Sequence, residues 1–160
     1  MASPVSIPHR RLIGIGNEFR SDDGVGLAVA RRLEAMHIPQ LEILLHPGDG
    51  ASLMELWIDN APPEVYLVDA VGSGAPPGTI FRLDAIKQPI PTEFFSYSTH
   101  AFAVAEAVEL CRNLGQLPPA LYIYGIEGAN FANGERLSPA IKSAAEELVE
   151  EIRHRFQPLE

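Results

Sequence analysis

The chain has little cysteine and little positive charge, and it lacks long apolar runs. Cys111 is its single cysteine, which excludes an intramolecular disulfide and a zinc site built on cysteines. Its 12 Lys and Arg against 21 Asp and Glu give a net charge of −9, which argues against a nucleic-acid partner. No apolar stretch approaches the roughly 20 residues of a membrane helix, and no signal-peptide pattern opens the chain. We therefore expect a cytoplasmic protein with no membrane or nucleic-acid partner.

Enough apolar residues are present to build one folded domain. They make up 46% of the 160 residues, near the average of globular proteins. A chain of this length buries a core without disulfides or a structural metal. We expect a single domain over residues 1–160, in which residues 1–10 form an extension before the first strand.

Short apolar runs alternate with helical patterns along the chain. Several runs are almost continuously apolar, which is typical of strands covered on both faces. The expected strands are 12–16, 41–46, 64–70, 79–83 and 121–126, and the expected helices are 25–36, 51–58, one beginning near Ala101, and 139–156 with Ser138 as N-cap. This alternation predicts an α/β fold with a five-stranded, mostly parallel twisted sheet and helices on both faces, in three layers. Ligands of such sheets bind at the carboxyl ends of the strands.

The first motif lies where the first expected strand passes into a helix. It reads Gly14-Ile15-Gly16-Asn17, followed by Asp22-Asp23-Gly24-Val25-Gly26. A dinucleotide site is disfavoured, because Phe19 stands where a third glycine is needed and two carboxylates would repel a pyrophosphate. Either aspartate can cap the helix and complement its dipole. One carboxylate suffices for that role, so the other is available for chemistry.

Two further residues stand at expected strand and helix ends. Asp69 closes an apolar strand, where it either belongs to a site or caps the following turn. His100 is expected at the start of a helix, with Ser98 or Thr99 as cap. The positive helix end favours a neutral imidazole, which a metal requires. The alternative for His100 is an ordinary exposed or core histidine.

Together, Asp23, Asp69 and His100 offer two oxygen ligands and one nitrogen ligand from three loops at one sheet edge. Such a set suits a borderline divalent metal such as Ni²⁺ or Zn²⁺ and leaves coordination positions open for a substrate. Asp49, in Gly48-Asp49-Gly50, either lines the cleft or serves the turn, and the turn is favoured. His46 is a weaker reserve candidate.

In their order, these motifs are similar to those of the hydrogenase maturation endopeptidases. That family has a first strand ending in Gly-x-Gly-Asn, an acidic pair before Gly-x-Gly, a strand ending in Asp-Ala, a Pro-Gly-Thr and a histidine. The corresponding residues here are Gly14–Asn17, Asp22–Gly26, Asp69-Ala70, Pro77-Gly78-Thr79 and His100. The resemblance covers about residues 11–155 and implies a sheet of the phosphorylase/hydrolase-like kind.

The resemblance also implies a function. Asp23, Asp69 and His100 would contact nickel, which arrives with the substrate, and the enzyme would remove the C-terminal extension of a nickel-iron hydrogenase large-subunit precursor. Asp23 and Asp69 are the catalytic candidates. Either one of them acts as general base, or the nickel polarises the scissile carbonyl or a water. We expect the substrate to be bound by Asn17, Asp22, Asp49 and Gly72.

Two rival hypotheses remain. Peptidyl-tRNA hydrolases also begin with a strand into Gly-x-Gly-Asn, but their catalytic histidine soon after it has no counterpart in residues 18–26. A non-catalytic, nickel-dependent binding module for the same precursor would use the same ligands without hydrolysis. Ala101 and Phe102 follow His100 where many family members carry a polar residue, which leaves the partner hydrogenase open.

Overall fold

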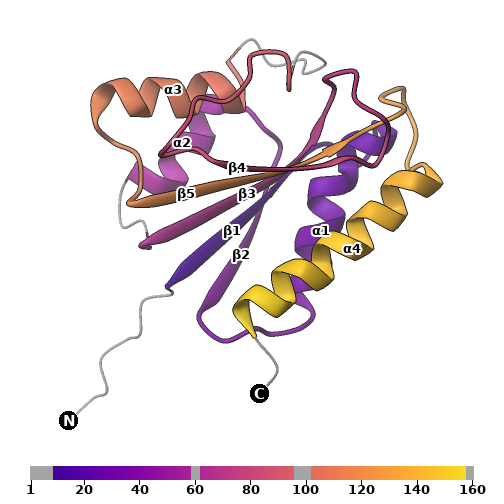
Figure 1. The fold of residues 1–160 in the computed structure, drawn as a ribbon, viewed down its shortest axis with the longest axis horizontal. Helices are drawn as coiled ribbons and strands as arrows, with labels where there is room; N and C mark the ends of the chain where they lie inside the picture. The colour runs from indigo at the N-terminus through magenta and orange to yellow at the C-terminus, as the bar shows by residue number, and fades with distance from the viewer. Residues whose placement is uncertain (1–8, 59–61, 96–101, 158–160) are drawn as a thin grey trace.

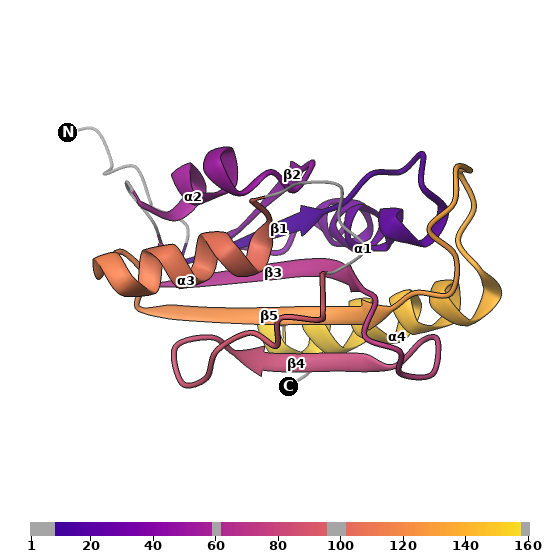
Figure 2. The same cartoon turned by 90° about the horizontal axis from the view of Figure 1, so that it is seen from above.

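The computed structural model describes residues 9–58, 62–95 and 102–157. Five strands form one sheet in the order β2-β1-β3-β5-β4 (Figure 2). Their bounds are β1 Arg10–Ile15, β2 Leu41–His46, β3 Glu64–Val71, β4 Ile80–Asp84 and β5 Ala120–Glu127. Parallel pairs join β1 to β2, β1 to β3 and β3 to β5, whereas β4 runs antiparallel to β5. The expected mostly parallel sheet is therefore confirmed.

Helices cover both faces of this sheet (Figure 1). The 3-10 turn η1 Ser21–Gly24 leads into α1 Val25–Glu34, and the other helices are α2 Gly50–Ile58, α3 Val104–Leu114 and α4 Pro139–Phe156. α1 packs beside α4 on one face, and α2 packs beside α3 on the other. This arrangement confirms the three-layer α/β fold.

Neighbouring strand residues alternate between the two cores. Leu12 and Tyr66 belong to the core under α1 and α4, whereas Ile13 and Leu67 belong to the core under α2 and α3. All four side chains are fully buried. A central strand needs apolar residues at both parities when both faces are covered, which explains why the runs are continuous rather than alternating.

Two predicted boundaries were wrong. Strand β1 begins at Arg10, inside the expected extension, because the arginines at its start form ion pairs across the sheet: Arg10 with Glu64 at 3.0 Å and Arg11 with Glu42 at 2.9 Å. Helix α3 begins only at Val104, and its first turn is closed by Glu106, which accepts a hydrogen bond from the Ala103 amide. The expected caps Ser98 and Thr99 lie outside the described residues.

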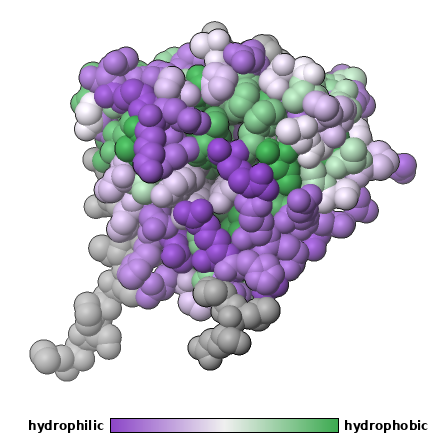
Figure 3. Space-filling view, in the orientation of Figure 1, coloured by the Kyte–Doolittle hydropathy of each residue, from purple (hydrophilic) through white to green (hydrophobic). Residues whose placement is uncertain are grey.

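The surface agrees with a chain of mixed polarity. Hydrophilic residues cover much of the face seen in Figure 3, with hydrophobic residues exposed between them. Within the described ranges, none of the helices is long and apolar enough to span a bilayer.

Candidate active site at the carboxyl edge of the sheet

Buried polar residues gather at one edge of the molecule. In the described part of the chain they are Ser21, Asp22, Asp23, His46, Asp69 and Glu127. They occupy the turn after β1 and the carboxyl-terminal ends of β2, β3 and β5. Buried carboxylates are costly unless they are paired, hydrogen-bonded or used to bind a ligand. Their concentration at this edge marks it as the functional end of the sheet.

A cavity of about 410 Å³ opens at this edge, between β1 and β3. It lies where the chain order of the strands reverses, since β1 is followed on one side by β2 and on the other by β3. Such a reversal leaves a crevice between loops that turn to opposite faces of the sheet. Asp23 and Asp69 are both among the residues that line it. The structure thus brings together the two aspartates that were predicted to carry the chemistry.

Asp23 reaches the cavity because β1 ends in a closely packed turn. At Gly16, φ is +152°, and a Cβ added there would lie 2.0 Å from the Asp23 carbonyl oxygen. Only glycine permits this approach. The Asn17 amide then donates a hydrogen bond of 3.0 Å to Asp23 Oδ2. Asn17, predicted to bind substrate, lines the cavity, and its own Oδ1 accepts from the Phe19 amide.

Asp22 has a different environment, although it is the next residue. It is completely buried, and the residues described as lining the cavity do not include it. Its carboxylate accepts hydrogen bonds from the amides of Ala129, Asn130 and Ser138 and from the Ser138 hydroxyl, at 2.7–2.9 Å. Asp22 therefore ties the loop after β5, and the start of α4, to the turn that carries Asp23.

Asp69 enters the cavity from the end of β3. It is 5% exposed, and its Oδ1 accepts a hydrogen bond of 2.7 Å from the Ala70 amide. Gly72, predicted to bind substrate, is not among the lining residues, and its amide donates to the Phe94 carbonyl at 2.8 Å. The loop that follows is held by Glu127, which accepts from the amides of Ser73 and Gly74.

Asp49 caps helix α2, as the favoured turn interpretation predicted. Its Oδ1 accepts from the Ser52 amide at 3.0 Å, and its Oδ2 accepts from the Ser52 hydroxyl. That hydroxyl also lies 2.9 Å from His46 Nε2, while His46 Nδ1 accepts from the Gly48 amide. The Nδ1 contact requires the proton on Nε2, so the hydrogen bonds run from His46 through Ser52 to Asp49. This network fixes the loop whose Pro47 and Gly48 line the cavity.

The third predicted ligand, His100, lies outside the described residues. Within the ranges that are described, the structure holds no cluster of three or more His, Cys, Asp or Glu arranged to bind a metal. Among the described residues that line the cavity, the two buried aspartates, Asp23 and Asp69, offer carboxylate side chains as oxygen donors. A divalent metal would accept such donors but would need further ligands.

Several wall residues escaped the sequence interpretation. Phe19 is 59% exposed beside the cavity, Arg20 is the one cation in its described lining, and Phe95 supplies an apolar wall. Phe19 had been used only as evidence against a dinucleotide motif, and Arg20 had been considered only as part of a stretch without histidine. A large apolar residue within an otherwise polar loop was the available signal for this wall.

A cavity with two aspartates at the switch point of a mostly parallel α/β sheet has the position of a ligand-binding or catalytic site. The family described as hydrogenase maturation protease matches residues 28–155, most of the chain. The hydrogenase 2 maturation protease of Escherichia coli K12 is 26% identical over 146 residues, which cover 88% of this chain and 86% of that protein.

Solved structures of hydrogenase maturation proteases have the same fold. The hydrogenase maturation protease HycI from Thermococcus kodakarensis superposes with a TM-score of 0.73 at 26% identity, covering 96% of this chain and 95% of that one. The endopeptidase HybD from E. coli has the same TM-score at 20% identity, covering 92% and 91%, and supports the fold. The chain belongs to the hydrogenase maturation protease family, whose members are peptidases.

Proposed function

We propose that this protein is the endopeptidase that removes the C-terminal extension of a nickel-iron hydrogenase large-subunit precursor. The reaction adds water across one peptide bond, which leaves a new carboxylate on the large subunit and an amine on the released extension. Family membership supports the reaction class. The observation that carries the assignment to a site is the pair of buried carboxylates, Asp23 and Asp69, in one cavity.

The shape of the cavity suits a peptide segment. Its volume of about 410 Å³ lies within the usual range for sites that bind small ligands. The walls are largely apolar, with Ile15, Leu27 and Val104 among them, so the chemistry depends on the few polar groups. A loop or chain end of another protein can enter such a crevice, whereas a folded domain cannot.

We propose further that the precursor brings nickel to this cavity and that Asp23 and Asp69 bind it there. Two carboxylates in one buried cavity repel each other, and a divalent cation relieves that repulsion. His100 is proposed as the third ligand from its place in the sequence motif. Hydrogen bonds from the amides of Asn17 and Ala70 orient the two carboxylates before the substrate arrives.

The test is the intact mass of the purified precursor, in nickel-loaded and nickel-free forms, with and without this protein. We expect a C-terminal peptide to be lost only from the nickel-loaded form. A stable complex without any change of mass would instead support the non-catalytic binding module. Cleavage of both forms at equal rates would contradict the role of nickel.

Isosteric variants assign the carboxylates. Asp23→Asn and Asp69→Asn remove a charge while keeping the shape, so we expect the cleavage rate to fall about 100-fold or more, the usual scale for a lost catalytic group. Asp84→Asn is the matched control, because Asp84 ends the antiparallel strand β4 and so lies at the opposite edge of the sheet. Wild-type cleavage by Asp23→Asn would exclude Asp23 both as a nickel ligand and as the general base.

A further inference from the structure

A second concave surface lies between α1 and α4, on the face of the sheet away from α2 and α3. This groove has a volume of about 770 Å³, larger than that of the carboxylate cavity. Its floor includes Val29 and Val149, which belong to the core, and its walls include the half-buried Met36 and Leu137. Open apolar grooves between helices are places where proteins receive apolar side chains of a partner.

The rim of the groove is basic. It carries Arg31, Arg32, Arg136 and Lys142 against a single acid, Glu146. The whole chain has only 12 basic residues and a net charge of −9, so four of the 12 meet at one surface. Arg31 is bound to Glu18 at 3.0 Å. Arg32, Arg136 and Lys142 form no ion pair with any described residue, although Arg32 is, after Arg153 and His154, one of the cations that lower the pKa of the Glu150 carboxyl. Arg136 and Lys142 therefore have the most charge available to a partner.

An ion pair and several hydrogen bonds connect the groove to the carboxylate cavity. Glu18 lines the cavity and its ion-pair partner Arg31 lines the groove. Arg136 and Leu137 stand in the loop that the Asp22 carboxylate holds against η1, the turn that presents Asp23. A protein that places one segment in the cavity can therefore place another in the groove.

We propose that this groove, the α1–α4 groove, docks an acidic segment of the precursor that carries apolar side chains. The inference rests on the proposed function. A small cavity gives too little contact to select one protein, since specific interfaces bury about 800 Å² per partner. The apolar floor accepts the apolar side chains and the three cations bind the carboxylates. An acidic polypeptide fits this surface better than a nucleic acid, whose phosphates do not use an apolar floor.

The experiment combines charge reversal with separate measurements of binding and cleavage. Lys142→Glu, Arg32→Glu and the double variant are compared with Lys87→Glu, an exposed lysine after β4 that gives the same change of charge away from the groove. For the double variant we expect KM for the nickel-loaded precursor to rise about tenfold with kcat unchanged, because rim charges act on association. We also expect added NaCl to raise KM for the wild type and to have a weaker effect on the double variant.

Binding is measured by titration of the precursor against Asp69→Asn, with and without the two groove reversals. A weaker Kd with the reversals supports the α1–α4 groove even if no variant cleaves, in which case the proposed function fails alone. Wild-type KM and Kd in the double variant would overturn the groove while leaving the protease assignment intact. Loss of self-association in the double variant, with unchanged precursor binding, would also overturn it and identify a second copy of this chain as the occupant.

Discussion

Asp22 and Asp23 are neighbours in the chain whose carboxylates serve different parts of the molecule. In a 3-10 turn, successive side chains point roughly 120° apart. Ser21 precedes them with φ of 52°, held by hydrogen bonds to the carbonyls of Gly134 and Ala132. This tightly bound turn directs Asp22 into the protein and Asp23 into the cavity. Asp22 is therefore a support for the site, although it was predicted to bind substrate.

Replacing Asp22 tests that distinction. Asp22→Ala removes the fully buried carboxylate that accepts from three backbone amides and one hydroxyl, so we expect the free energy of unfolding to fall by about 3–5 kcal/mol. Urea denaturation measures the loss. Asp22→Asn keeps one acceptor oxygen and should lose less. A stable Asp22→Ala variant that only binds the precursor more weakly would restore Asp22 as a substrate-binding residue.

Among the secondary-structure elements, α1 has the closest contact with the sheet. A Cβ at Gly26 would lie 2.3 Å from the Val68 carbonyl oxygen and 2.4 Å from that of Ile15. Similarly, a Cβ at Gly14 would lie 2.5 Å from the Gly26 carbonyl oxygen. The glycines of the first motif thus bring helix and strands together, and this contact places η1 beside the end of β3.

Gly26→Ala should push α1 away from the strands. Both clashing atoms belong to the backbone and cannot rotate aside, so we expect a loss of about 3 kcal/mol or more in unfolding free energy. Gly24→Ala is the milder control, since a Cβ added at Gly24 would lie no closer than 3.1 Å to its nearest atom, the Glu18 Cα. Thermal unfolding of the two variants gives the comparison. Equal stabilities would show that the helix can shift without cost.

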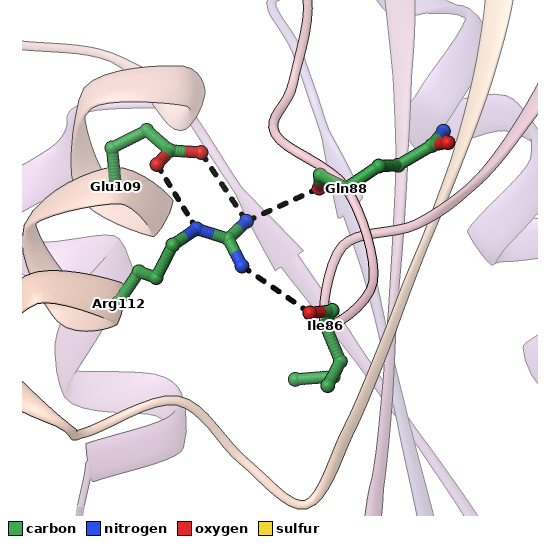
Figure 4. Close-up of polar contacts among 4 residues, drawn as sticks. All are labelled: Ile86, Gln88, Glu109 and Arg112. Atoms are coloured by element: carbon green, nitrogen blue, oxygen red, sulfur yellow. Dashed lines mark hydrogen bonds and ion pairs between the residues drawn. The ribbon is translucent and has the colours of Figure 1, made fainter.

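On the opposite face, α3 is braced by its own arginine. Arg112 binds Glu109 within the helix and donates to the carbonyls of Ile86 and Gln88, which follow β4 (Figure 4). One guanidinium has donors for all these acceptors, so it can join a helix to a loop. This contact attaches the segment after β4 to α3. In the chain, α3 follows Phe95, which is a residue of the cavity wall.

At the scale of the whole molecule, the two ends of the sheet differ in kind. The carboxyl edge holds the buried carboxylates, whereas the amino-terminal half of β3 holds an aromatic and arginine cluster. Tyr66 is fully buried there, donates to Glu64 at 2.7 Å and stacks on Tyr122, with the Arg155 guanidinium over both rings. Such packed, fully bonded clusters stabilise a fold and leave the other edge available for chemistry.

This cluster predicts how the stability of the protein depends on pH. Burial, and then the hydrogen bond to Glu64, raise the pKa of Tyr66 above its usual 10.0. A raised pKa in the folded state means that the stabilisation is complete below about pH 10 and is lost as the pH rises further. We expect the free energy of unfolding to fall above about pH 10, and to fall less steeply in Tyr66→Phe.

The measurement is urea denaturation between neutral pH and pH 11. At neutral pH, Tyr66→Phe should be about 1–2 kcal/mol less stable, because it loses one hydrogen bond to a carboxylate. Burial also raises the pKa of Tyr124, so some alkaline dependence should remain in the variant. Identical slopes for both proteins would mean that Tyr66 ionises as easily in the folded state as in the unfolded chain.

Local pattern was enough for much of this molecule. The strands were predictable because a strand covered on both faces must be apolar throughout, and α4 was predictable from its repeat and from Pro139 at its first position. Asp49 was predicted to be a turn residue from its place in Gly48-Asp49-Gly50, and a local pattern could suffice because its partner, Ser52, is only three residues away. Asp23 and Asp69 were found as carboxylates at the ends of apolar elements, where the fold class places ligand sites.

Other features depend on contacts between distant parts of the chain. Local pattern could not separate Asp22 from Asp23, which only the family resemblance distinguished, because the groups that bind the Asp22 carboxylate lie 107 to 116 residues away in sequence. The α1–α4 groove likewise needs two helices separated by more than half of the chain. The sequence by itself determined the elements, their order and the acidic character of the edge, since these follow from local composition and periodicity. Only the tertiary structure decided that Asp22 is buried against the loop after β5 and where the scattered cations meet, because both depend on packing between segments that no local pattern records.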